Sequence, residues 1–224
     1  MMRSSSSPLP GLLLMLSATT GLVDAVSVLG LGKVFTANMT GNIVFLGFAA
    51  VGTPGFAIKP YLVALLTFLI GALVAGRIGQ SLGRRPLRQW LLAAAGIEGA
   101  LLALAAICAL ASAPWIDAII ALTALAMGFR NATIRMLKVP DLTTTVLTLT
   151  LTGIAADSPL AGGTGPNLPR RIAAVASIFA GAAAGALMVT HLGLALPLAL
   201  AAGMVVLGTM LCVAHPAAAL VHNP

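Results

Sequence analysis

The chain has 224 residues, of which 59% are hydrophobic and only 8% are charged. A soluble domain carries about 25% charged residues, so this composition excludes a water-soluble globular domain and is typical of a chain whose solvent is lipid. The net charge of +7 would suit nucleic-acid binding in a soluble protein. Here the basic residues lie mostly at the ends of apolar segments and aromatic residues are few, so the charge indicates membrane orientation and no nucleic-acid partner is expected.

Apolar segments long enough to cross a hydrocarbon core of about 30 Å predict six membrane-spanning helices. They cover residues 11–31, 61–82, 89–111, 116–136, 172–192 and 194–215. Two shorter helices are expected at 38–51 and 143–156, because both segments are rich in Thr or Asn and are followed by Gly and Pro. The first apolar run has no clear cleavage site and is interpreted as a retained helix, not a signal peptide.

The second part of the chain repeats the pattern of the first. A shift of 107 residues superimposes polar and small residues of the two parts, which indicates an internal repeat. The matched pairs include Gly21 with Gly128, Asp24 with Asn131, Thr36 with Thr143 and, after three extra residues, Gly71 with Gly181. We expect a tail at 1–10, a first half at 11–112, a second half at 113–217 and a C-terminal tail at 218–224.

Two topologies are compatible with this repeat. If the short helices do not cross the membrane, each half has three spans and the halves are inverted. If they do cross, the protein has eight spans in two parallel halves of four. With the 84–88 loop in the cytoplasm, six spans place eight basic residues inside and two outside, whereas eight spans place six inside and four outside. The charges favour six spans, with both termini in the cytoplasm and two re-entrant or half-length helices.

The sequence around the first short helix resembles a known family. The dipeptide Asp24-Ala25 is followed by Met39-Thr40-Gly41-Asn42, as in the YoaK family (DUF1275) of bacterial membrane proteins. The second half departs from the pattern, since Thr148 is followed by Leu149 where the family has Gly. The resemblance implies a multi-pass protein of the bacterial cytoplasmic membrane, and the family brings no settled biochemical activity.

Charged residues inside the predicted spans are the first candidate site residues. Asp24 lies near the middle of the first span, where a carboxylate costs about 2.5–3.5 kcal/mol, so it should bind a cation, proton or substrate, or pair with Arg130. Arg130 could instead reach the cytoplasmic end or hold a substrate anion, beside Asn131. Glu98 has no obvious partner in the sequence. It is either a protonated acid that donates a hydrogen bond to a neighbouring carbonyl group or a proton-coupling site.

The two short polar segments are the second candidate. Interrupted helices expose free backbone groups that can bind ions or polar solutes, and the alternative is hydrogen bonding that holds packed helices together. The remaining candidate binding residues are Asn38, Thr40, Gly41, Asn42, Thr144, Thr145 and Thr148.

These features predict a transporter or permease for a small solute or ion, with a midplane site between the two halves. The alternatives are a membrane scaffold or a membrane-embedded enzyme of unknown activity. The sequence contains no catalytic triad, no phosphate-binding loop and no cluster of metal ligands, so we expect neither enzymatic activity, metal nor cofactor. The expected partners are the lipid bilayer, the solute and a possible second copy of the chain.

Overall fold

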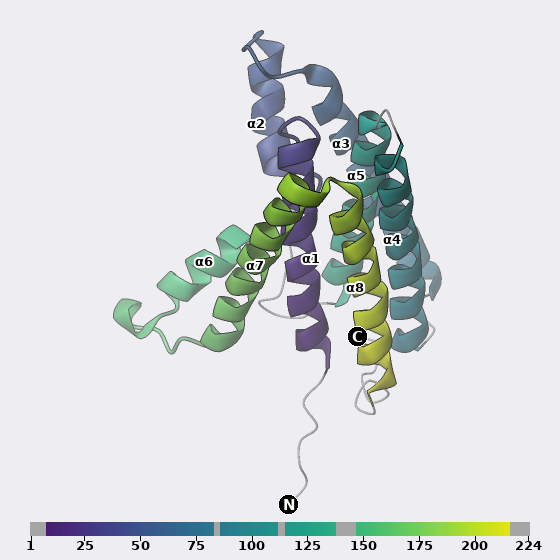
Figure 1. The fold of residues 1–224 in the computed structure, drawn as a ribbon. Coiled ribbons are helices and arrows are strands. Elements are labelled where there is room, and N and C mark those ends of the chain that lie inside the picture. Colours follow the sequence, from purple (N-terminus) through teal and green to yellow (C-terminus); the bar gives the residue numbers. More distant parts are fainter. Residues whose placement is uncertain (1–7, 83–85, 112–114, 138–146, 216–224) are drawn as a thin grey trace, which may run out of the picture.

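The computed structural model describes residues 8–82, 86–111, 115–137 and 147–215. These residues form eight α-helices and one short 3₁₀ helix, with no strand among them (Figure 1), so the predicted all-α class is confirmed. The elements are α1 (Leu9–Gly30), α2 (Met39–Ala50), α3 (Ile58–Leu82), α4 (Leu87–Ala109), α5 (Ile116–Leu137), α6 (Leu147–Ala156), η1 (Pro159–Ala161), α7 (Leu168–Leu192) and α8 (Ala195–Ala214).

The long helices coincide with the six predicted spans and the short ones, α2 and α6, with the two polar segments. The largest differences are at α3 and α7, which begin three and four residues earlier than predicted. Both helices include a proline in the first turn, Pro60 or Pro169, where the missing N–H leaves no hydrogen bond unmade. Five of the described helices are long and apolar enough to cross a membrane, and α5 is of similar length but less apolar.

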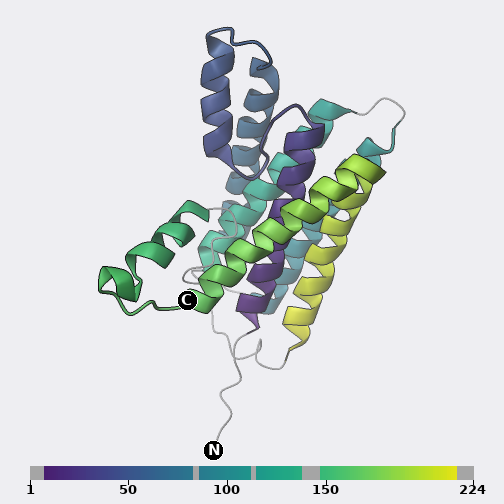
Figure 2. The same cartoon turned by 60° about the vertical axis from the view of Figure 1, so that its left-hand side comes forward.

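The helices of the two halves run in opposite directions. In Figures 1 and 2, α1, α4 and α7 run from the lower to the upper end of the molecule, and α3, α5 and α8 run back. The short helix α2 lies against α3 at the upper end, and α6 lies against α7 at the lower end. Each element of the first half therefore has a counterpart of opposite direction in the second.

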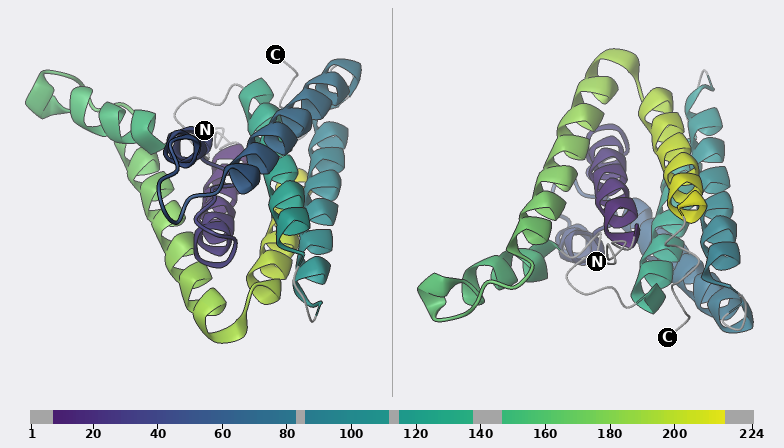
Figure 3. Two further views of the ribbon diagram at one scale, coloured as in Figure 1. Left: turned by 90° about the horizontal axis from the view of Figure 1, so that it is seen from above. Right: turned by 90° about the horizontal axis from the view of Figure 1, so that it is seen from below.

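The packing follows the same relation. The main contacts of α1 are with α7 and α8, and those of α5 are with the matching helices α3 and α4, while α4 also packs against α8. Figure 3 shows α1 within the angle between α7 and α8. The pattern of burial also repeats. Each residue of 12–27 is buried or half-buried as its counterpart in 119–134 is, and each residue of 61–80 is buried, half-buried or exposed as its counterpart in 171–190 is.

Matched glycines form the two tightest helix crossings. A Cβ atom on Gly181 would lie 1.9 Å from the carbonyl oxygen of Ala18, where α7 crosses α1. A Cβ atom on Gly71 would lie 2.1 Å from the carbonyl oxygen of Leu125, where α3 crosses α5. The reciprocal contacts involve Gly21 with Ile178 and Gly128 with Phe68. Small residues that let helix backbones approach are the usual basis of membrane helix packing.

The two short helices are attached by different chemistry. Ring contacts link α2 to the start of α3, and they join Phe35, Phe45, Phe48, Phe56 and Tyr61. At the other end, Arg171 of α7 donates a hydrogen bond of 2.7 Å to Asp157, which follows α6. Its guanidinium lies so close to Gly153 of α6 that a Cβ atom there would be 2.7 Å from the nearest nitrogen.

Candidate functional site

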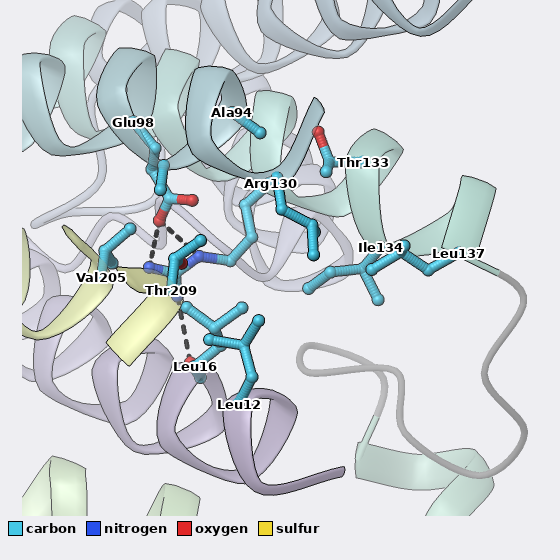
Figure 4. Close-up of a pocket in the computed structure, with 12 residues that line it drawn as sticks. Leu12, Leu16, Ala94, Glu98, Arg130, Thr133, Ile134, Leu137, Val205 and Thr209 are labelled. Carbon is cyan, nitrogen blue, oxygen red and sulfur yellow. Dashed lines mark hydrogen bonds and ion pairs between the residues drawn. The ribbon is translucent and has the colours of Figure 1, made fainter. Parts of the chain in front are cut away.

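A buried ion pair joins the two halves of the protein. Arg130 of α5 and Glu98 of α4 are 1% and 4% exposed. The Nε atom of Arg130 donates to Oε1 of Glu98 at 2.5 Å, and its Nη2 atom contacts the same oxygen (Figure 4). The Nη1 atom donates to the carbonyl oxygen of Leu16 at 3.1 Å and to the hydroxyl of Thr20 at 3.0 Å, both on α1. The arginine therefore binds α1, α4 and α5 together.

Helix geometry explains why these two charges meet. Both side chains point inward from long helices that pack along each other. A buried charge is expensive in a low-dielectric environment unless it is paired and hydrogen-bonded, and this pair satisfies both conditions. Removing either partner would leave an isolated charge among apolar side chains, so the two residues depend on each other.

A small cavity of about 30 Å³ lies against the ion pair. Its lining includes Glu98, Arg130, Thr133 and Thr209, and its other residues are apolar (Figure 4). The Thr133 hydroxyl is buried and has no hydrogen-bond partner among the described residues. A cavity of this size holds about one water molecule, provided that polar groups line it.

Asp24 holds the segment that leads into α2. Its Oδ1 atom accepts a hydrogen bond of 3.3 Å from the backbone N–H of Ala37, two residues before α2 begins. The Asp24 side chain makes no ion pair with a described basic residue, although the Arg130 charge is near enough to attract it. The neighbouring Thr36 hydroxyl is buried without a hydrogen-bond partner among the described residues. The carboxylate therefore faces backbone amides, one turn along α1 from Thr20.

Asn42 closes the same segment into a compact loop. Its Oδ1 atom accepts a hydrogen bond of 2.9 Å from the backbone N–H of Phe35, and its Nδ2 atom donates one of 2.5 Å to the carbonyl oxygen of Phe35. Gly41 lies under the Phe35 ring, since a Cβ atom would be 2.7 Å from it. Gly41 and Asn42 of the Met-Thr-Gly-Asn stretch thus hold the preceding loop against the first turn of α2.

Comparison with known proteins agrees with these features. The model of the family described as protein of unknown function (DUF1275) matches residues 12–211. The chain belongs to the DUF1275 family. It is 34% identical over 151 residues to the UPF0700 transmembrane protein YoaK of Bacillus subtilis (strain 168), and the match covers 65% of each chain. No solved structure matches. The composition, the helices and this relative together make the DUF1275 protein a multi-pass membrane protein.

The structure of the DUF1275 protein corrects the predictions for Arg130 and Glu98. Arg130 was a candidate partner of Asp24, but its carboxylate partner is Glu98. Glu98 lacked an obvious partner in the sequence because only the packing of α4 against α5 brings the two together. Arg130 also does not extend toward the lower end, since its side chain is buried between helices.

The predicted polar residues do not form one pocket in this conformation. Asn38 and Thr40 are exposed at the start of α2, and Thr148 is exposed on α6, which packs against α7. Thr144 and Thr145 lie outside the described residues. Asn131 is half-buried beside Arg130 in the sequence, and its Nδ2 atom donates to the carbonyl oxygen of Met127 in its own helix.

Sequence reasoning missed Thr20, whose hydroxyl accepts a hydrogen bond from Arg130, and Thr133, which lines the cavity beside the ion pair. A signal was available, because Thr20 lies one turn before Asp24 and Thr133 three residues after Arg130, so each shares a helix face with a charge. Thr is common in membrane helices, however, and bonds to its own backbone in most cases. Only the packing of four helices around the cavity distinguishes Thr133 from the others.

Proposed function

We propose that this DUF1275 protein transports a small solute or ion, using the charged groups at the interface of its two halves. The observation that carries the proposal is the buried Glu98–Arg130 pair, which lies where antiparallel copies of one helical unit meet. Transporters with inverted repeats commonly bind substrate and coupling ions near the midplane, at the repeat interface. Charged side chains inside a membrane are expensive and are usually retained for function.

The proposed topology has six spans with inverted halves. At about 1.5 Å per residue, the 12 residues of α2 and the 10 of α6 reach only about 18 and 15 Å, short of the hydrocarbon core of about 30 Å. Such lengths support half-length or re-entrant helices. In this topology α5 crosses the membrane together with the five more apolar helices. Its buried charge is tolerated because Arg130 is paired inside the bundle.

The proposed orientation places the lower end in the cytoplasm of a bacterial cell, with both termini there. Described basic residues near that end belong to the start of α4, the end of α5 and the start of α7, namely Arg88, Arg135, Arg170 and Arg171. Lys33 and Lys59 belong to the upper end. This asymmetry agrees with the excess of positive charge on cytoplasmic loops.

In this proposal, of the charged groups inside the bundle, Asp24 lies nearer the upper end and the Glu98–Arg130 pair nearer the lower end. Thr20 lies between them on α1. Its hydroxyl donates a hydrogen bond to the carbonyl oxygen of Leu16 and accepts one from Arg130. A polar route thus passes along one helix through an otherwise apolar core. The protein would act without enzymatic chemistry, in the lipid bilayer, as a monomer or a homodimer.

The test is solute-dependent stabilisation of the purified protein. A panel of sugars, amino acids, organic acids and inorganic ions is screened for a shift in the thermal unfolding midpoint of the wild type, of Asp24→Asn and of the control Asp117→Asn. Asp117 is an exposed carboxylate at the start of α5, so its variant removes the same charge without touching the core. We expect a solute that stabilises the wild type and the control but not Asp24→Asn. If every solute acts equally on all three, or on none, a scaffold role replaces the transporter proposal.

A further inference from the structure

The cavity beside Glu98 reaches only one end of the molecule. Besides the ion pair, its lining includes Leu91 near the start of α4, Leu137 at the end of α5 and Leu12 near the start of α1. Because α1 and α4 start at the lower end in Figure 1 and α5 finishes there, all three positions belong to the lower parts of their helices. The residues that line the cavity therefore extend from the buried carboxylate toward the lower end.

We propose that this cavity holds water that carries protons between the lower end and Glu98, which makes the proton the coupling ion of the proposed transport function. The inference rests on that function for its role in coupling, but the binding of the proton can be measured without transport. The cavity of about 30 Å³ has room for a water molecule. Four polar residues line the cavity, namely Glu98, Arg130, Thr133 and Thr209, and the buried Thr133 hydroxyl has no hydrogen-bond partner among the described residues. A buried water needs about two to four such polar partners.

The geometry of the ion pair leaves one carboxylate oxygen for the proton. Both contacts from Arg130 go to Oε1 of Glu98, and neither uses Oε2. In the exchange step, hydronium in the cavity transfers a proton to Oε2, giving a neutral carboxylic acid and water. Arg130 keeps its charge and its bonds to Leu16 and Thr20, so the arginine retains two hydrogen bonds when the ion pair is lost.

The groups that face Glu98 come from three neighbouring helices. Arg130 is the charged group from α5, and α8 contributes Val205 and Thr209. The nearest titratable group further along α8 is the buried thiol of Cys212. From α1, Leu16 and Thr20 lie near the pair through Arg130, and Asp24 is one turn beyond Thr20. Two carboxylates thus share the field of one arginine, and a proton added at Glu98 strengthens the attraction of Arg130 for Asp24.

The matching region of the upper end is closed. The shift of 107 residues relates Arg130 to Val23, Thr133 to Val26 and Thr209 to Leu102, and each of these counterparts is 0% exposed. No polar group there replaces the arginine. In this conformation water reaches Glu98 from the lower end, and the upper end is sealed by apolar side chains.

Infrared spectroscopy of the protein in lipid bilayers tests the proposal. On acidification, the carboxylic-acid carbonyl band of the wild type should contain a component that persists in Asp24→Asn and in Asp117→Asn but is missing from Glu98→Gln. Exchange of the acid proton for deuterium should slow by about tenfold in Thr133→Val, on the order of the loss of one hydrogen bond. The control is Thr123→Val, which removes a buried hydroxyl at the upper end that donates to the carbonyl oxygen of Ile119.

The outcomes separate this inference from the transport function. If Glu98→Gln loses no component of the band, if a component is lost only in Asp24→Asn, or if Thr133→Val and Thr123→Val exchange at the same rate, the inference is wrong, whatever the solute screen shows. If the Glu98 band titrates but no solute binds, the proton site stands and the transporter proposal fails. Because Glu98→Gln leaves Arg130 unpaired and could unfold the protein, the two threonine variants carry the decision independently.

Discussion

The lower and upper ends of the bundle share one backbone arrangement and differ in a few side chains. Glu98 and Val205 are related by the shift of 107 residues, as are Arg130 and Val23. Both members of each pair are buried, and the helices that carry them pack in the same way. Glu98 and Arg130 form an ion pair beside a cavity, whereas Val23 is a fully buried aliphatic side chain and Val205 is an apolar residue that lines that same cavity.

This difference separates what makes the fold from what makes the site. The repeated features are small residues at helix crossings and the order of buried positions along each helix, and they are sufficient to place the helices. The charges occur once, so the packing does not require them. A pair that the fold does not need, and that costs free energy to bury, is best explained by function.

The largest effect should follow from breaking the ion pair. Glu98→Leu leaves Arg130 charged and unpaired inside the bundle, so we expect a loss of about 3–5 kcal/mol in the free energy of unfolding, measured by denaturant titration in detergent micelles. In the double variant Glu98→Leu with Arg130→Leu, both charges are replaced by apolar side chains like those of the upper end. That variant should recover most of the loss.

A double variant as unstable as the single one would contradict this comparison. It would mean that Arg130 stabilises the bundle mainly through its hydrogen bonds to Leu16 and Thr20, and that the upper and lower ends are not interchangeable in packing. The charges would then belong to the fold.

The second effect concerns the glycine crossings that the two halves share. Gly71→Ala and Gly181→Ala each place a methyl group against a backbone oxygen, so the helices must separate, at a cost of about 1–3 kcal/mol in the free energy of unfolding. Gly76→Ala is the control on α3, because no described atom lies within 4 Å of the added carbon. It should be neutral or slightly stabilising, as alanine favours a helix by up to about 1 kcal/mol.

Equal losses at Gly71 and Gly181 would support the equivalence of the two crossings. A loss at only one of them would show that the halves share a shape but not the energetics of packing. The measurement is the same denaturant titration, with circular dichroism as the signal.

The success of sequence reasoning follows the same division between fold and site. Apolar segment length predicts helices because lipid leaves the backbone few other ways to satisfy its hydrogen bonds. The repeat of Gly21 at Gly128 and of Gly71 at Gly181 is visible in the sequence, and these glycines do meet backbone oxygens of a neighbouring helix. The starts of α3 and α7 lie earlier than predicted, because both helices begin with a turn that contains a proline and a basic residue and so does not belong to the apolar segment.

The partner of Arg130 could not be predicted in this way. The match of Asp24 with Asn131 suggested that charges near the repeat axis would meet, yet Glu98 lies 32 residues from Arg130 and has the apolar counterpart Val205. Which side chains pair across helices depends on which helix faces are in contact, and a weak sequence repeat does not determine those faces. The role of Asn42 was equally hidden, since its bonds to Phe35 depend on the shape of one loop.

The smallest effect should come from ion pairs near the surface. At the upper end Lys59 and Asp117 lie 2.5 Å apart, with side chains 72% and 51% exposed, and at the lower end Arg171 is buried against Asp157. Screening limits the exposed pair to about 0.2–1 kcal/mol, so Asp117→Asn should barely change the free energy of unfolding. Asp157→Asn should cost more, because it removes the partner of a buried guanidinium.

The distinguishing measurement is the salt dependence of both variants. The effect of Asp117→Asn should fall toward zero as ionic strength rises, and the effect of Asp157→Asn should persist, because buried pairs are screened far less. Protection of the α6–α7 connection from proteases provides a local readout, since Asp157 lies between α6 and η1. If the two variants respond alike to salt and to proteolysis, the ion pair of Arg171 with Asp157 does not hold α6 against α7.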